Sequence, residues 1–454
     1  MAKRTIWTLA LAFLPSLADA SAVPPPPAPA LASHAFRLSD PAEVIASMEA
    51  GCAGCSWERA DREAAVLRVR VDGRYSQHLL LLRGEAPAPY RIALGALGAG
   101  SHTLTFELDR TWTPAAIRTA RVTNVQTEAA TAADPRHATL AHAPVLCARP
   151  NTIRRFTDVP ILEWVETDSR PDGRRLRYSV IFTNEDGGTP ADRLLATWGR
   201  LTDIEYVYSV ELGASGRVGL SEYQGPDHVV RTFAGLREGL HPIIHVVTDN
   251  NMVSDTGTCE VRFTLVPKPF DLTATSREAV MDAEPWSYRV SSEEARREGR
   301  VVEGSKPGDK TILDPRRYAY IEACAPTRDA GITFSLSVKT PGGIVFRESD
   351  GGFGKFLIQR ERENFPNGCF RGAVSLPEGA TPESIVAIRF RARTRPPHKD
   401  EAPLAPGTGA ARLLSVNKIF LLGPGDMPGK NLFSWTGDLQ MTPDGPEVEL
   451  KIGG

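Results

Sequence analysis

The chain has 454 residues, and its 53 basic and 55 acidic side chains leave a formal net charge of −2. This near-neutral balance argues against a protein that binds nucleic acid through bulk positive charge. With 41% apolar and 24% charged residues, the composition is that of a globular protein and excludes disorder throughout. The length predicts two to four domains, and 39 glycines and 36 prolines predict many turns.

Residues 1–20 have the pattern of a signal peptide. Lys3 and Arg4 precede a short apolar stretch, and Ala18-Asp19-Ala20 provides an A-x-A cleavage site. The following segment, 21–33, is rich in proline and alanine and predicts an extended linker. No later segment is long and apolar enough to span a bilayer, so we expect a secreted or periplasmic protein with no transmembrane segment in the mature chain.

Six cysteines predict a disulfide framework, because an even number in an exported chain favours pairing. They are Cys52, Cys55, Cys147, Cys259, Cys324 and Cys369. Order along the chain favours Cys52–Cys55, Cys147–Cys259 and Cys324–Cys369, one bridge in each predicted domain. The alternative for Cys52 and Cys55 is half a zinc site or a redox pair; with no second CxxC motif and no thioredoxin-like pattern, a short structural bridge is favoured.

Alternation of apolar and polar residues between turn-forming residues predicts strands in three regions. The first region, 34–130, has predicted strands at 65–71 and 101–108. The second, 143–270, has them at 177–183, 204–212 and 242–248. The third, 273–454, has them at 332–338, 384–395 and 411–422.

Helices are expected at only two places. Asp40 and Pro41 offer an N-cap and a first-turn proline for a helix over 40–49, and 291–298 is a second, very polar candidate. The sequence therefore predicts an all-β fold of three β-sandwich-like domains in series with few short helices, the C-terminal domain being jelly-roll-like.

The middle region carries the candidate catalytic residues. Asp203 and Glu205 lie two residues apart on a predicted strand, so their side chains share one face. His228 follows in a turn, and His245 and Asp249 lie on and just after the next predicted strand. If these segments are neighbours, the carboxylates and imidazoles converge on a site for general acid–base catalysis or for calcium. The alternative is that Asp203 caps a turn and Glu205 pairs with an arginine.

A zinc site is not expected at His241 and His245. Four residues apart, they would share one face of a helix, but on a strand they are separated by about 13 Å. We therefore assign no metal ligands and expect no cofactor other than calcium at the carboxylate–histidine cluster.

The order of residues in the middle region resembles the vacuolar-protein-sorting-sixty-two-like family. Members carry Asp-Trp-Glu on a comparable strand and a histidine after it, matched here by Asp203, Glu205 and His228, with Asn184 in the preceding turn. Ile204 stands in place of the tryptophan. The resemblance covers about 143–255 and implies a related fold there; the family has no firm activity to transfer.

One predicted strand in the third region carries a row of arginines on one face. They are Arg389, Arg391, Arg393 and Arg395. Guanidinium groups in such a row would bind the carboxylate or sulfate groups of an anionic polysaccharide. The alternative is a solvated strand whose charges discourage edge-to-edge pairing.

These observations favour a carbohydrate-active protein, a polysaccharide hydrolase or lyase that uses the carboxylate–histidine cluster. Its expected partner is an extracellular polysaccharide or a cell-envelope glycan. The alternatives are a non-catalytic glycan-binding or adhesion protein and a structural protein of the envelope.

Overall fold

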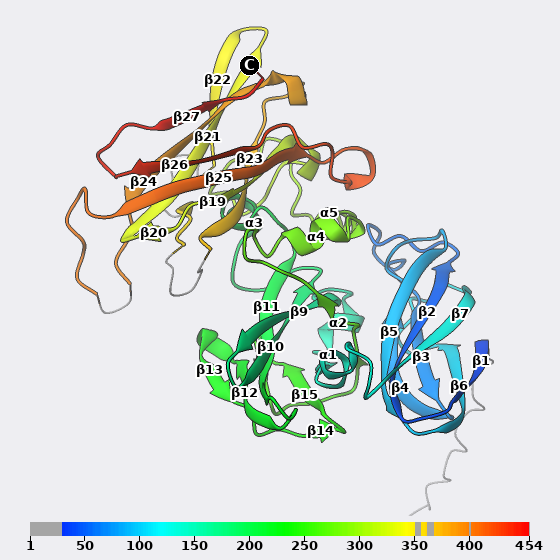
Figure 1. The fold of residues 1–454 in the computed structure, drawn as a ribbon. Helices are drawn as coiled ribbons and strands as arrows, with labels where there is room; N and C mark the ends of the chain where they lie inside the picture. Colours follow the sequence, from blue (N-terminus) through cyan, green and yellow to red (C-terminus); the bar gives the residue numbers. More distant parts are fainter. Residues whose placement is uncertain (1–29, 350–355, 361–366, 399–400, 454) are drawn as a thin grey trace, which may run out of the picture.

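The computed structural model describes residues 30–349, 356–360, 367–398 and 401–453. Strands hold 47% of the residues and helices 11%, and the strands form six sheets, which confirms the all-β prediction (Figure 1). The predicted signal peptide and residues 21–29 of the predicted linker lie outside the described residues. Among the helices of the described part, none is long and apolar enough to cross a membrane.

The N-terminal domain is a sandwich of a four-stranded and a three-stranded sheet. The first sheet has the order β1 (Ala30–Leu38), β6 (Gly100–Leu108), β3 (Val66–Val71) and β4 (Arg74–Leu80). The second has the order β5 (Ala88–Leu97), β2 (Ala42–Cys52) and β7 (Ala120–Thr131). Apolar side chains from both sheets, such as Val44, Leu67 and Phe106, fill the core between them. Strand β1 begins inside the predicted linker and pairs with β6.

The helix predicted over 40–49 is wrong, because this segment is the central strand β2. It forms antiparallel ladders with β5 on one side and β7 on the other. The side chains of Val44, Ala46 and Met48, at every second position, enter the core. The segment therefore has the two-residue periodicity of a strand, and its backbone groups form hydrogen bonds to both neighbouring strands. Pairing on both edges together with core burial outweighs the local helix-start signal at Asp40 and Pro41.

The middle domain is also a sandwich. Its six-stranded sheet has the order β13 (Val230–Thr232), β12 (Val218–Gln224), β11 (Asp203–Gly213), β10 (Gly173–Phe182), β9 (Pro160–Arg170) and β18 (Lys268–Pro269). The second sheet has the order β14 (Arg237–Glu238), β15 (His241–Val246), β8 (Val145–Cys147) and β17 (Arg262–Phe263), with β16 (Val253–Ser254) on β15. Three short helices that the sequence analysis missed are α1 (His137–Ala141), α2 (Asn151–Arg154) and α3 (Ala191–Trp198).

The C-terminal domain is the third sandwich. One sheet has the order β20 (Thr327–Arg328), β25 (Ala410–Leu421), β19 (Tyr318–Cys324) and β23 (Cys369–Ser375), with β26 (Trp435–Met441) on β25. The other has the order β22 (Gly343–Glu348), β21 (Ala330–Thr340), β24 (Ile385–Thr394) and β27 (Val448–Lys451). Phe334, Phe370 and Phe390 pack in its core. Single 3-10 turns lie at Pro226–His228, Pro315–Arg317, Pro382–Ser384 and Pro424–Asp426.

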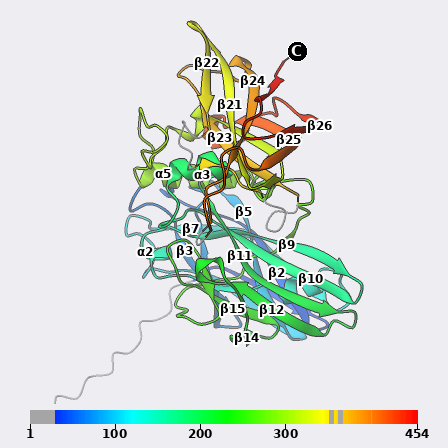
Figure 2. The ribbon, with the colours of Figure 1, turned by 90° about the vertical axis from the view of Figure 1, so that its left-hand side faces the viewer.

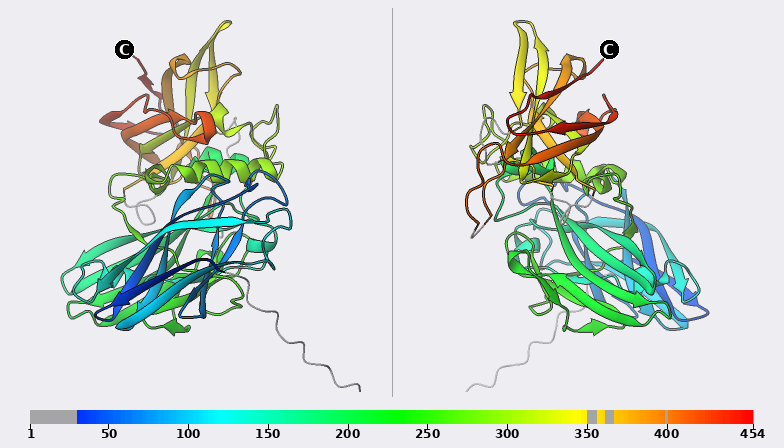
Figure 3. Two further views of the ribbon diagram at one scale, coloured as in Figure 1. Left: turned by 90° about the vertical axis from the view of Figure 1, so that its right-hand side faces the viewer. Right: turned by 60° about the vertical axis from the view of Figure 1, so that its left-hand side comes forward.

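Two helices, α4 (Ala279–Ala283) and α5 (Trp286–Arg297), lie where the three domains meet (Figures 2 and 3). Helix α5 confirms the helix predicted near 291–298 and begins earlier. One continuous core at this junction includes Trp57 from the N-terminal domain, Trp164 from the middle domain and Phe420 from the C-terminal domain. The three domains are therefore packed on one another through shared apolar residues.

All three predicted disulfides are confirmed. Cys52–Cys55, Cys147–Cys259 and Cys324–Cys369 place one bridge in each domain. The described part of the chain contains no free cysteine. Such complete pairing indicates an oxidising compartment outside the cytoplasm.

Candidate functional site

Asp203 and Glu205, the predicted catalytic carboxylates, lie at the start of β11 and are buried. Asn251 Nδ2 donates to Asp203 Oδ2 at 3.0 Å, and Arg200 Nη1 lies 3.8 Å from Asp203 Oδ1. Burial raises the pKa of Asp203 above its usual range. Burial, and then the charge of Asp203, raise the pKa of Glu205 well above its usual range. The structure therefore brings these two carboxyl groups together, as expected from their spacing.

The two predicted catalytic histidines lie elsewhere. His228 is exposed in the turn after β12, where its Nδ1 lies 2.9 Å from Gln224 Nε2. His245 is on β15, in the other sheet, and its Nδ1 lies 3.0 Å from the Thr258 carbonyl oxygen. Within the described residues, neither histidine forms a hydrogen bond or ion pair with Asp203 or Glu205.

A third buried carboxyl group, Glu185, completes an inner acidic cluster with Asp203 and Glu205. Burial and the nearby Asp203 raise the pKa of Glu185 to about 7. The Thr189 N–H donates to its Oε1 at 2.8 Å. Gly188 has a φ of +109°, and a Cβ there would lie 2.3 Å from this oxygen, so glycine is required. Glu185 was not predicted as a site residue, because the segment 184–188 has the composition of an ordinary turn.

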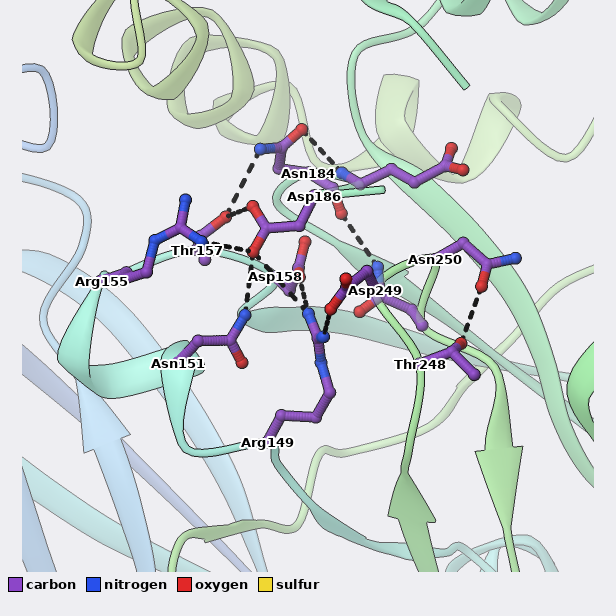
Figure 4. Close-up of polar contacts among 12 residues, drawn as sticks. Arg149, Asn151, Arg155, Thr157, Asp158, Asn184, Asp186, Thr248, Asp249 and Asn250 are labelled. Atoms are coloured by element: carbon purple, nitrogen blue, oxygen red, sulfur yellow. Dashed lines mark hydrogen bonds and ion pairs between the residues drawn. The ribbon is translucent and has the colours of Figure 1, made fainter. Parts of the chain in front are cut away.

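A second cluster, the Arg149 site, consists of Arg149, Asp158, Asp186 and Asp249 (Figure 4). The Arg149 guanidinium donates to both Asp158 and Asp249. Its Nη2 also lies 3.8 Å from Asp186 Oδ2. Asp249 was predicted as a binding residue, whereas the other three were not singled out, because they lie far from it in the sequence.

Four strand ends position the Arg149 site. Arg149 follows β8, Asp158 precedes β9, Asp186 follows β10 and Asp249 follows β15. These ends meet at one end of the middle sandwich, because β8 runs parallel to β15 and β9 runs antiparallel to β10.

Further hydrogen bonds hold the loops of the Arg149 site in place. Asn151 Nδ2 and Thr157 Oγ1 each donate to Asp186 at 2.8 Å. The Gly187 N–H donates to the Asp249 carbonyl oxygen at 2.9 Å. These contacts tie the loop after β10 to helix α2 and to the loop after β15, so the acidic side chains are kept near one another.

Asp158 and Asp249 contact the same guanidinium, but one side chain is buried and the other is exposed. The Asp158 side chain is 0% exposed, whereas that of Asp249 is 73% exposed. Burial, and then the charge of Asp186, raise the pKa of Asp158 to about 8, and Arg149 offsets this only in part. Asp158 Oδ1 has no hydrogen-bond partner among the described residues. A buried carboxyl group with a raised pKa and an accessible carboxylate thus share one guanidinium, and carboxyl groups in such different environments are typical of acid–base sites.

The predicted arginine row lies on β24 for three of its four members. Arg389, Arg391 and Arg393 alternate along this strand, but Arg395 follows its end and is buried. The Arg395 guanidinium pairs with Asp329 at 3.0 Å and with Glu401 at 2.6 Å. Arg395 therefore anchors two loops, and three arginines remain on the sheet face.

No group of three or more histidine, cysteine, aspartate or glutamate side chains in the described ranges is arranged to hold a metal ion.

Comparison with known proteins adds no family to these observations. The resemblance of 143–255 to the vacuolar-protein-sorting-sixty-two-like family stays a prediction. No protein-family model matches the chain, and a search of the curated proteins found none with significant similarity to it.

Proposed function

We propose that this protein is a secreted or periplasmic carbohydrate-active enzyme, a polysaccharide hydrolase or lyase, whose reaction takes place at the Arg149 site. The observation that carries the proposal is the single guanidinium shared by a buried carboxyl group, Asp158, and an exposed one, Asp249. The three disulfides support a location outside the cytoplasm, where such polymers are found.

In this proposal Asp249 is the group that touches the substrate. It is the accessible acid of the site. In a hydrolase its carboxylate takes a proton from water as the water oxygen bonds to the anomeric carbon, the glycosidic C–O bond breaks and the leaving oxygen takes a proton from solvent. In a lyase the carboxylate takes the proton from the sugar carbon, a carbon–carbon double bond forms, and the neighbouring C–O bond breaks with the leaving oxygen protonated by solvent. Arg149 is a positioning residue, because it holds the Asp249 carboxylate in one orientation. Asp158 does not touch the substrate in this proposal. It contacts Arg149, and its own charge sets the net charge next to the Arg149 guanidinium.

The reaction is placed at the Arg149 site and not at Asp203 and Glu205, because both of those carboxyl groups are buried. The inner acidic cluster supports the end of the sandwich on which the Arg149 site is built. Asn251, the partner of Asp203, also donates to the Asn184 carbonyl oxygen at 3.0 Å, two residues before Asp186.

Asp249→Asn is expected to lower the rate of polysaccharide cleavage at least 100-fold, because it removes the accessible base and leaves the shape unchanged. Asp168→Asn is the matched control: Asp168 lies in the same domain, its side chain is 66% exposed, and it also pairs with an arginine, Arg170. The measurement is product release from a panel of neutral and acidic polysaccharides by the full mature chain.

Glu205→Gln tests, in the same assay, whether the inner acidic cluster takes part in the reaction or only the Arg149 site does. We expect this variant to keep cleavage within several-fold of the parent once its folded fraction is matched by circular dichroism. Equal activity of the Asp249→Asn variant and the parent would remove the Arg149 site from the mechanism. Binding of a polysaccharide without any product would favour the non-catalytic alternative.

A further inference from the structure

One sheet of the C-terminal domain has a second face, directed away from the domain core, that carries charged side chains. We infer that this face, which we call the basic sheet face, binds acidic polysaccharides. It is built by the sheet β22–β21–β24–β27, and the side chains that alternate with those of the core project from it. The basic side chains on it are Lys339, Arg389, Arg391, Arg393 and Lys451. The acidic ones are Glu348, Glu449 and, just before β27, Glu447.

Strand register places the charged residues in rows across the sheet. On β21, Ser335 lies opposite Arg389 of β24 and opposite Glu348 of β22. Because Arg389, Arg391 and Arg393 are at alternate positions of one strand, their Cα atoms are about 7 Å apart. An extended polymer with a regular repeat of anionic groups fits such a row better than a compact ligand does.

An exposed aromatic ring borders the arginine row. Phe346 of β22 is 53% exposed, and the Arg389 guanidinium lies 4.3 Å from the centre of its ring. Ile344, two residues earlier on the same edge strand, is 58% exposed. An accessible aromatic ring beside cations suits a sugar ring with an acidic substituent, since the apolar side of the sugar packs on the ring and the acid meets the guanidinium.

The acidic residues on this face do not prevent it from binding anions. Arg389 pairs with Glu449 at 2.6 Å, and Arg391 pairs with Glu447 at 3.2 Å. Solvent-exposed ion pairs of this kind are weak, so a polyanion can compete for the guanidinium groups. The described residues of these strands place five basic side chains against three acidic ones on this face, whereas the whole chain has a formal charge of −2.

This inference does not rest on the proposed enzymatic function. The basic sheet face belongs to the C-terminal domain, whereas the Arg149 site belongs to the middle domain. Binding at the face would hold an acidic polymer whether or not the Arg149 site cleaves it. The two proposals therefore fail separately.

The test is binding of the full mature chain to sodium alginate, to dextran sulfate and to neutral dextran, measured by isothermal titration calorimetry. Alginate and dextran sulfate distinguish carboxylate from sulfate recognition, and neutral dextran tests the need for charge. We expect at least one acidic polymer to bind and neutral dextran not to bind. The double variant Arg391→Gln/Arg393→Gln is expected to bind that polymer at least 10-fold more weakly.

Arg37→Gln/Arg121→Gln is the matched control, because it removes two exposed arginines from the N-terminal domain and changes the net charge equally. We expect it to keep the parent affinity. Phe346→Ala is expected to weaken binding several-fold, and thermal unfolding of each variant checks that its fold is intact. Equal weakening by the control pair, absence of binding to both acidic polymers, or equally tight binding of double-stranded DNA would overturn the inference.

Discussion

Replacing Arg371 by methionine is expected to lower the free energy of unfolding by about 3–5 kcal/mol, because it leaves the buried Glu322 carboxylate without its paired cation. Arg371 lies on β23, and its side chain is 0% exposed. Its Nη1 and Nη2 donate to Asp282 of α4 at 3.0 and 2.6 Å, and its Nη2 also contacts Glu322 of β19. Burial disfavours ionisation of Asp282, but Arg371 and Lys418 together outweigh it and lower the pKa of that carboxyl.

The space around Arg371 is closely packed. Gly199, which ends α3 with a φ of +57°, approaches so near that a Cβ there would lie 2.6 Å from Arg371 Cγ. Arg371 therefore links α3 and α4 to the C-terminal domain, and its loss weakens the junction as well as one strand.

Denaturant unfolding followed by tryptophan fluorescence measures this effect. Arg412→Met is the control, since Arg412 lies on β25, pairs with Asp438 and is 47% exposed. It is expected to change stability by less than about 0.5 kcal/mol. Adding Glu322→Gln to Arg371→Met should restore part of the loss, because one uncompensated charge is removed. A loss below about 1 kcal/mol for Arg371→Met would show that the buried network is not what stabilises the junction.

Glu163→Gln is expected to stabilise the protein at alkaline pH and to leave its stability at pH 4.5 nearly unchanged. Glu163 lies on β9, is 2% exposed, and neither carboxyl oxygen has a hydrogen-bond partner in the described part of the chain. Burial raises its pKa well above the ordinary value of 4.5. The folded protein thus retains a proton that the unfolded chain releases, so stability is lost as pH rises above 4.5.

The loss from this group amounts to about 1.4 kcal/mol per pH unit while the folded carboxyl stays protonated. Unfolding curves of the parent and Glu163→Gln between pH 4.5 and 8.5 should therefore diverge steadily. Glu211→Gln is the control, because its side chain is 34% exposed and pairs with Arg170 on the surface. Parallel curves for the parent and the Glu163→Gln variant would contradict a protonated, buried Glu163.

Each of the eight strands predicted from local pattern is a strand in the structure, but the segment of β2 was predicted as a helix. The strands predicted at 65–71, 101–108 and 204–212 from alternating apolar and polar residues correspond to β3, β6 and β11. The segment 40–49 carries a helix-start signal as well as an alternating apolar pattern, and only pairing with β5 and β7 decides between them. Long-range hydrogen bonds of this kind leave no local signature in the sequence.

The candidate site was predicted only in part for a similar reason. Strand periodicity places Asp203 beside Glu205, and the structure brings them together. The distances from these two residues to His228 and His245 depend on which strands are neighbours, and the two histidines lie in an exposed turn and in the opposite sheet. Asp249 was singled out, but its partner Arg149 is 100 residues away in the sequence.

The all-β class, the favoured set of disulfide pairs and the alternation of the β24 arginines could be predicted from the amino-acid sequence, because each follows from neighbouring residues or from order along the chain. The junction around α5, the buried position of Arg395 and the contacts of Arg149 with Asp158 and Asp249 could be seen only in the folded chain. These features depend on how strand ends and domain surfaces pack, and packing is set by the whole chain at once.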